Sequence, residues 1–328
     1  MGLEGAESLL LQTLQKGDRG IDLSVRAVGG RSARAWAPMV GARWMPWPGT
    51  RAPSYAAWGA DLVHLTGLTV APPRHKPYAL TVHDCLALRF PDEVSPPPWF
   101  ESVLHRATGV LTVSQATAGD LVDLGVPPEK IHQMHQGPQI VGGARPDNLP
   151  EDNALVVLRS GGYTQRKNVG LLLDAWPRVH LLTGARLVLT GPRSGPGYPA
   201  EQINRLQAHG VEDLGYVGPR ELQRLYETVH LVVSPSIGEG FGLPALEAMA
   251  SGVPFVGTRT AFFEELCADA AVLADAEPDA FGAQIVRVLS DVALRRDLVG
   301  RGLSRAKNYT WEGAALEVVA AYQSMTTK

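Results

Sequence analysis

One stretch, residues 229–254, constrains the fold of this chain more than any other. It begins with an apolar, mostly β-branched run, Val229–Val233, which predicts a buried strand. A turn containing three glycines follows. Pro244 suits the first position of a helix, where its missing N–H has no partner to lose, and Gly252 suits the end of that helix. The pattern predicts one strand–turn–helix unit of a doubly wound α/β domain.

Two carboxylates frame this unit, Glu239 in the glycine turn and Glu247 on the helix. Glycines beside Glu239 let backbone N–H groups approach a ligand closely, and a helix start favours an anion. Two acids at this interval can also be solvated residues of an ordinary crossover. The glycines, prolines and small residues around them favour a ligand site.

Length and composition limit the class of protein. The chain has 328 residues, 45% of them hydrophobic and 19% charged, which fits a globular protein of about two domains. A net charge of −3 argues against a general nucleic-acid binder. Cys85 and Cys267 lie in apolar contexts and are expected to be reduced, packed thiols of a cytoplasmic protein. We find neither a signal peptide nor an apolar run long enough to span a bilayer.

Predicted strands and helices alternate along most of the chain, which indicates parallel sheets covered on both faces. Residues 142–151 have the composition of a linker. We therefore expect domains at 1–145 and 146–310 and a final helix within 311–328. The expected strands are 21–28, 61–66, 77–84, 110–114, 131–134, 155–158, 185–190, 211–217, 229–233, 254–257 and 271–273. The expected helices include 3–15, 99–107, 115–124, 168–179, 199–209, 220–227, 262–266, 279–289, 292–308 and 311–325.

A second cluster joins the first strand of the second domain to its first helix. It contains Gly161, Gly162, Arg166 and Lys167 and ends at Asn168, a residue type that caps helices. Arginine can hold two phosphate oxygens, lysine adds a point charge, and the helix N-terminus adds partial positive charge. The cluster predicts a diphosphate site, with a solvated basic helix start as the alternative.

Together these motifs resemble the retaining GT-B glycosyltransferases of family 4. The stretch around Glu239 and Glu247 resembles the family's Glu-x7-Glu signature. The family's phosphate site usually has an arginine five residues before the lysine. Gly162 holds that position here, so the role passes to Arg166 and Lys167. The resemblance implies two Rossmann-like domains facing across a cleft, with the ligand at the carboxyl ends of their strands.

The resemblance also implies roles for single residues. Glu247 would bind the ribose hydroxyls, because a carboxylate can accept two hydrogen bonds from a diol. Glu239 would hold the sugar hydroxyls, and Val217 would present backbone to the base. His83 would face the donor sugar from the first domain, and Ser114 is a weaker candidate there. The expected backbone N–H donors are Gly240, Phe241, Gly242 and Leu243.

In this family a strand precedes the first glycine loop and lies inside the first sheet. The sequence begins at the loop, so the first domain is expected to lack that strand. Such a gap would leave unpaired backbone groups and an apolar opening.

The implied reaction moves a sugar, with retention, from a UDP- or GDP-type donor to a glycan or lipid-linked acceptor. Cations at the leaving diphosphate stabilise the transition state, so neither a metal nor another cofactor is expected. His132 and His135 are interpreted as structural. Arginines and tryptophans between 31 and 58 fit packing on the sheet, which we favour, or contact with a sugar acceptor or with the anionic inner membrane surface.

Alternatives remain open. A non-catalytic module that binds sugar nucleotides or a partner would fit the missing strand. A GT-B epimerase or phosphorylase is a third reading, although the cofactor-bearing lysine motif of a phosphorylase is not found. The base, sugar and acceptor are not identified by the sequence.

Overall fold

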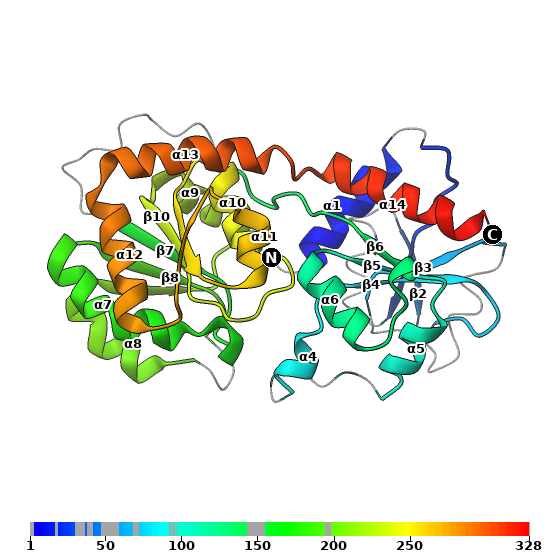
Figure 1. The fold of residues 1–328 in the computed structure, drawn as a ribbon, viewed down its shortest axis with the longest axis horizontal. Coiled ribbons are helices and arrows are strands. Elements are labelled where there is room, and N and C mark those ends of the chain that lie inside the picture. Colours follow the sequence, from blue (N-terminus) through cyan, green and yellow to red (C-terminus); the bar gives the residue numbers. More distant parts are fainter. Residues whose placement is uncertain are drawn as a thin grey trace. The chain divides into compact units, whose positions relative to one another are not determined.

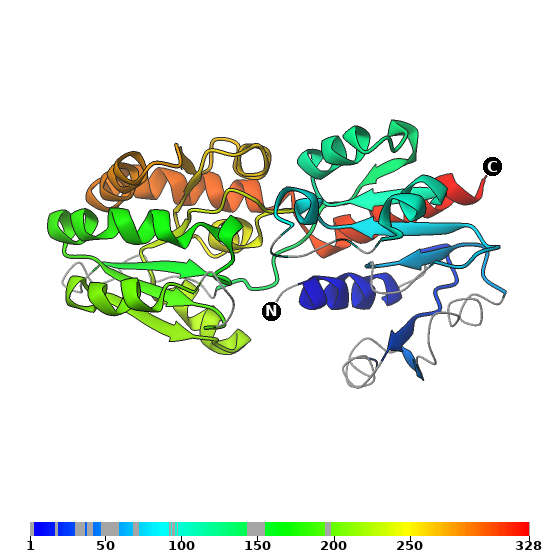
Figure 2. The same cartoon turned by 90° about the horizontal axis from the view of Figure 1, so that it is seen from below.

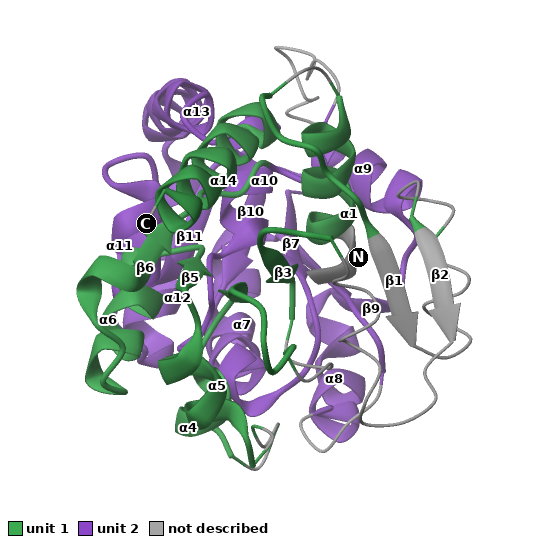
Figure 3. Ribbon diagram, turned by 90° about the vertical axis from the view of Figure 1, so that its right-hand side faces the viewer, with its two compact units in different colours: residues 1–137, 310–328 green, residues 138–309 purple. Residues whose placement is uncertain are grey.

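The protein forms two compact units in a computed structural model (Figure 3). The first unit comprises residues 1–137 and 310–328, and the second comprises residues 138–309. The first unit thus ends before the expected boundary at 145, and the last helix belongs to it. The structure describes residues 3–16, 19–29, 37, 42–46, 59–67, 72–91, 93, 96, 98–142, 155–193 and 198–327.

The second unit is built on a parallel sheet of six strands in the order β12-β11-β10-β7-β8-β9. The strand order reverses between β7 and β10, which are paired neighbours. In open α/β sheets this switch point opens a crevice at the carboxyl ends of the strands, where ligands bind. The strands are β7 (Val156–Ser160), β8 (Arg186–Thr190), β9 (Val211–Gly215), β10 (Leu231–Ser234), β11 (Phe255–Thr258) and β12 (Val272–Ala274).

Helices cover both faces of this sheet (Figures 1 and 2). Trp176 of α7 and Phe281 of α12 are fully buried and belong to one core with the inner strands. The helices are α7 (Val169–Thr183), α8 (Ala200–Leu206), α9 (Pro219–Thr228), α10 (Leu243–Ala250), α11 (Ala261–Cys267), α12 (Pro278–Ser290) and α13 (Val292–Ala306). Single 3-10 turns lie at η3 (Gln165–Lys167) and η4 (Gln207–His209).

The described strands of the first unit form two separate parallel sheets. One pairs β1 (Arg26–Gly29) with β2 (Arg43–Pro46). The other has the order β3-β4-β5-β6, with β3 (Val63–Leu65), β4 (Tyr78–Val82), β5 (Gly109–Thr112) and β6 (Ile131–Gln133). Among the described strands, β1 and β3 do not pair, so the two sheets are separate in their hydrogen bonding. The expected lack of an inner strand stays a prediction.

The long helices of the first unit come from opposite ends of the chain. Helix α1 (Leu3–Gln15) packs against α14 (Trp311–Thr326), and α14 also contacts β5. Tyr322 of α14 lies with its hydroxyl 2.5 Å from Nδ1 of His64, whose Nε2 lies 2.7 Å from the Thr81 hydroxyl. The remaining helices are α4 (Leu86–Arg89), α5 (Phe100–Arg106), α6 (Gln115–Asp123) and the 3-10 turn η2 (Pro128–Lys130).

The structure differs from the sequence expectation at several elements. The first strand is shorter than 21–28, and both β2 and α4 lie where loops were expected. Asn168 stands at the start of α7 as predicted, but it is left-handed (φ 46°) and its side chain makes no capping hydrogen bond. Most of the arginine- and tryptophan-rich segment 31–58 and of the linker lies outside the described residues. None of the described helices has the length and apolar character needed to cross a membrane.

Candidate active site

The candidate site lies at the switch point of the second unit. The turn 161–168 follows β7, and the glycine turn 235–242 follows β10, so the two meet at one edge of the sheet. A backbone hydrogen bond of 2.9 Å from the Ile237 N–H to the Arg166 carbonyl joins the two turns directly. The pairing of two strands far apart in sequence therefore brings the two predicted motifs together.

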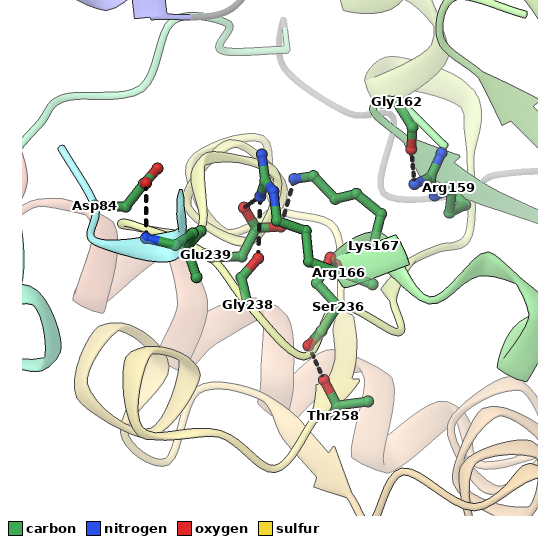
Figure 4. Close-up of polar contacts among 11 residues, drawn as sticks. Asp84, Arg159, Gly162, Arg166, Lys167, Ser236, Gly238, Glu239 and Thr258 are labelled. Carbon is green, nitrogen blue, oxygen red and sulfur yellow. Dashed lines mark hydrogen bonds and ion pairs between the residues drawn. The ribbon is translucent and has the colours of Figure 1, made fainter. Parts of the chain in front are cut away.

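The charged side chains of both turns converge on one carboxylate (Figure 4). The Lys167 ammonium donates to Oε1 of Glu239 at 2.5 Å. The Arg166 guanidinium lies 3.5 Å from Oε2 of Glu239 and donates to the Gly238 carbonyl at 3.1 Å. The Glu239 and Lys167 side chains are only 9% and 14% exposed, so this contact is largely withdrawn from water. The predicted sugar-binding acid and the predicted phosphate-binding cations thus share one site.

Electrostatics keep Glu239 ionised. Burial favours its neutral form, but the Lys167 ammonium, its hydrogen bond and the Arg166 guanidinium outweigh burial and lower the pKa of Glu239 below its usual value. A lysine carries three N–H donors, and within the described residues Glu239 is the one acceptor bonded to Lys167. The ammonium therefore has donors left for an additional anion.

The segment from Gly240 to Leu243 offers backbone donors beside Glu239. None of its N–H groups donates to an acceptor among the described residues. Gly242 has φ +94°, and a Cβ there would lie 3.1 Å from Phe263, so this position requires glycine. Helix α10 begins at the next residue with a proline in its first turn, as predicted. This segment can hydrogen-bond an anion or a set of hydroxyls.

Glu247 lies on α10 and is 6% exposed. The Tyr226 hydroxyl of α9 donates to its Oε2 at 3.0 Å. Burial raises the pKa of Glu247 to about 7, and the hydrogen bond from Tyr226 offsets only part of that effect. The sequence reasoning missed Tyr226, because no local pattern indicates that α9 packs a tyrosine against this carboxylate.

The glycine turn after β7 contains a second residue that the sequence reasoning missed. Arg159 is 1% exposed, and its guanidinium donates to the carbonyl of Gly162 (Figure 4) and to that of Gly161. A charged residue directly after the apolar run 155–158 was the available signal. Val217 follows β9 on the same edge of the sheet and is buried at 9% exposure.

His83 belongs to the first unit, at the end of β4. Its Nε2 lies 3.4 Å from Oε1 of Glu7 on α1, and neither ring nitrogen makes a hydrogen bond with a described residue. The ring lines a small pocket with Glu7, Thr66, Thr81, Gln136 and Trp311. This arrangement leaves a buried imidazole with spare hydrogen-bonding capacity in the first unit. Its predicted role toward the donor sugar stays a prediction.

Ser114 and His135 are occupied by contacts that hold the fold. The Ser114 hydroxyl is 2% exposed and caps α6 by accepting from the Thr117 N–H at 3.1 Å. This capping bond accounts for the serine structurally, and its predicted contact with the donor sugar stays a prediction. His135 contacts Glu317 of α14 through both its backbone N–H, at 2.6 Å, and Nδ1, at 2.7 Å. In the part of the chain that the structure describes, no three His, Cys, Asp or Glu side chains gather as a metal site.

Fold and site together define a class. Two parallel-sheet α/β units, with buried cations and carboxylates at the switch point of the second, are the architecture of GT-B proteins. The family described as "Glycosyltransferase Family 4" matches residues 14–138, and that described as "Glycosyl transferases group 1" matches residues 154–291. The chain belongs to the GT-B glycosyltransferases of family 4.

Two curated relatives illustrate the similarity. The chain is 36% identical over 171 residues to the O-antigen chain mannosyltransferase B of Escherichia coli, covering 50% of this chain and 44% of the relative. It is 29% identical over 231 residues to the MMP alpha-(1->4)-mannosyltransferase of Mycolicibacterium hassiacum, covering 67% and 55%. The chain thus spans about half the length of the curated relatives that it matches.

Solved structures share the fold over nearly the whole chain. HepE of Anabaena, solved with UDP and glucose, aligns with a TM-score of 0.77 at 16% identity, covering 99% of this chain and 96% of HepE. A glycosyltransferase from Rickettsia africae aligns with a TM-score of 0.77 at 13% identity, covering 98% and 94%. At these identities the likeness establishes the fold, including the two-domain architecture expected from the sequence.

Proposed function

We propose that this protein transfers a hexosyl group, with retention, from a nucleotide-diphosphate sugar to a glycan or lipid-linked acceptor, without a metal ion. The observation that carries the proposal is the contact of Lys167 and Arg166 with Glu239 at the switch point of the second unit. Family membership supports the reaction class, and the mannosyltransferases and UDP-bound HepE among its relatives support a UDP- or GDP-type donor.

The site suggests how the donor would be held. Lys167 and Arg166 would contact the diphosphate, and the N–H groups of Gly240–Leu243 together with Glu239 would contact the sugar. Glu247 would accept from the ribose hydroxyls, and the backbone near Val217 would contact the base. Lys167 and Arg166 already contact Glu239, and Tyr226 holds Glu247, so little ordering is needed on binding.

The chemistry follows from the charge that develops. When the bond from the anomeric carbon to the diphosphate breaks, the leaving oxygen gains negative charge. Lys167 and Arg166 stabilise that charge more than they stabilise the intact donor, which lowers the barrier. The departing phosphate then takes the proton of the attacking hydroxyl, so no protein base is required.

The test is binding and turnover with UDP-, GDP- and ADP-sugars. Calorimetry should detect one of these donors, and Lys167→Met should weaken its binding at least tenfold, whereas the matched control Lys307→Met, on an exposed lysine, should not. Turnover should survive a chelator and yield a product with unchanged anomeric configuration. Binding of a donor without transfer to any glycan or lipid-linked acceptor would favour the non-catalytic module. Absence of binding by every donor would refute the proposal.

A further inference from the structure

Arg159 is a buried cation with an unusual set of partners. It stands on β7 on the same face as Val157, a member of the apolar core. Nη1 donates to the Gly161 carbonyl at 2.5 Å, and Nη2 donates to the Gly162 carbonyl. The guanidinium carbon lies 5.1 Å from the centre of the Tyr163 ring. Burial lowers the pKa of Arg159 to about 10, so it remains a cation at neutral pH.

These two hydrogen bonds fix the direction of two consecutive peptide units. The units are trans, and in a trans peptide the N–H points opposite to the C=O. Because Arg159 draws the carbonyls of Gly161 and Gly162 toward itself, the N–H groups of Gly162 and Tyr163 point the other way. Neither N–H donates to an acceptor among the described residues.

The two glycines of the turn have open space beside their α-carbons within the described part of the chain. A Cβ built on Gly161 or Gly162 would meet no atom within 4 Å. Gly161 has φ +123°, which a side chain would disfavour, so glycine is needed to hold the turn in this shape. Successive backbone N–H groups of this kind form a concave anion receptor.

We propose that Arg159 is the positioning residue that shapes the turn at Gly161 and Gly162 into a backbone receptor for a phosphate of the donor. Its guanidinium bonds the carbonyls of Gly161 and Gly162 on one side of the turn. The N–H groups of Gly162 and Tyr163, which point to the opposite side, bind phosphate oxygens. Lys167 and Arg166 supply charge from the same turn. The inference rests on the proposed function, since it assigns a further part of the same diphosphate site.

The direct test follows the Tyr163 amide by NMR. The chain has 8 tyrosines, so a sample labelled with ¹⁵N-tyrosine gives few backbone signals, and Tyr163→Phe assigns the one of interest. On titration with UDP or GDP, whichever the protein binds, the Tyr163 amide proton should move downfield. Binding that leaves this signal unmoved would overturn the inference and leave the proposed function intact.

Variants of Arg159 test whether this residue acts by positioning the turn or only through its charge. Arg159→Met should weaken nucleoside diphosphate binding about tenfold to hundredfold. Arg159→Lys keeps the charge but lacks the planar fork that reaches the two carbonyls from two separate nitrogens, so it should remain about tenfold weaker than the parent. Equal affinity of Arg159→Lys and the parent would show that charge alone suffices and would refute positioning.

The matched control is Arg186→Met, on the exposed start of the neighbouring strand, which should bind as the parent does. Thermal unfolding checks that each variant folds, and the NMR result on the parent decides the question if Arg159→Met does not. If the parent binds neither UDP, GDP nor ADP, the proposed function fails and this inference fails with it.

Discussion

The ammonium of Lys167 lies 2.5 Å from Oε1 of Glu239, a residue 72 positions further along the chain. The contact forms because β7 and β10 are adjacent in the sheet, although α7, β8, α8, β9 and α9 all lie between them in sequence. Each partner needs the other, because a buried charge without a counter-charge is costly. The acid and the cation are therefore coupled in stability and in ligand binding.

Replacing Glu239 with glutamine should separate its contribution to stability from its contribution to ligand binding. The variant leaves Lys167 and Arg166 without their anion, so we expect a loss of about 1–3 kcal/mol in the free energy of unfolding. A nucleoside diphosphate would then supply the missing negative charge. It should raise the melting temperature of Glu239→Gln more than that of the parent, while sugar transfer falls about a hundredfold.

The control for this experiment is Glu221→Gln, an exposed carboxylate on α9. It should change neither stability nor transfer. A smaller diphosphate-induced rise in the melting temperature of Glu239→Gln than in that of the parent would contradict the charge coupling.

Glu247 gives the second unit a characteristic pH dependence. Its pKa is about 7 in the folded state against 4.5 ordinarily, so between these values the folded chain holds more protons than the unfolded one. The stabilising effect of this group is complete below about pH 4.5 and is lost as the pH rises to about 7. The expected slope is up to about 1.4 kcal/mol per pH unit. Denaturant unfolding of the parent and of Glu247→Gln across this range measures the difference.

If the ribose hydroxyls donate to Glu247, nucleotide binding should favour its ionised form. Binding near pH 6.5 should then release a proton, which calorimetry in buffers of different ionisation enthalpy detects. Glu247→Gln should abolish the release. Proton uptake by the parent would argue against ribose contact with this carboxylate.

His64 should give the first unit a pH dependence of stability that is opposite in sign to the one expected from Glu247. Burial first, and then the neighbouring His83, lower the pKa of His64 from 6.5 to about 4, so the folded chain holds fewer protons than the unfolded chain between these values. Its stability contribution is present above about pH 6.5 and is lost toward pH 4, by up to about 3 kcal/mol. His64→Gln should remove this acid sensitivity, whereas His105→Gln, on the exposed side of α5, should retain it. A parent whose first unit keeps constant stability over this range would contradict the assignment.

Most strands and helices could be predicted from the sequence, because their signals are local. Val229–Val233, the glycines after it and Pro244 each indicate their own conformation without reference to the rest of the chain. The strand β2 was missed because Arg43–Pro46 is short, ends in proline and alternates no apolar residues. Its pairing with β1 is a tertiary effect that propensity does not reveal.

The sequence predicted which residues belong to the candidate site better than it predicted the contacts that they make. Lys167, Arg166 and Glu239 were each named, and doubly wound topology made their meeting reasonable. The partner of Glu247 depends on how α9 packs against α10, and the role of Arg159 depends on the direction of two carbonyls. Neither contact is encoded at a fixed sequence spacing, so the sequence could draw attention to Arg159 as a charged residue after an apolar run but could not reveal these contacts.

The carboxyl ends of β7 and β8 in the second sheet approach each other closely at two glycines, Gly161 and Gly191. Gly191, after β8, has φ +138°, and a Cβ there would lie 2.0 Å from the carbonyl oxygen of Gly161. The Gly161 N–H in turn donates to the Thr190 carbonyl at 3.1 Å, so the two strand ends are bonded at this point. Any side chain at Gly191 must therefore displace the turn that precedes Lys167.

Gly191→Ala should consequently lose both stability and nucleotide binding. The strained backbone and the clash with a main-chain atom predict a loss of about 3 kcal/mol in the free energy of unfolding. Binding of the nucleoside diphosphate should weaken at least tenfold, because the turn at Gly161 moves. Gly300→Ala is the matched control: this exposed glycine within α13 has no atom within 4 Å of a Cβ, so alanine should stabilise the helix by about 1 kcal/mol. A Gly191→Ala protein with the parent's melting temperature and affinity would show that the strand ends can separate without affecting the site.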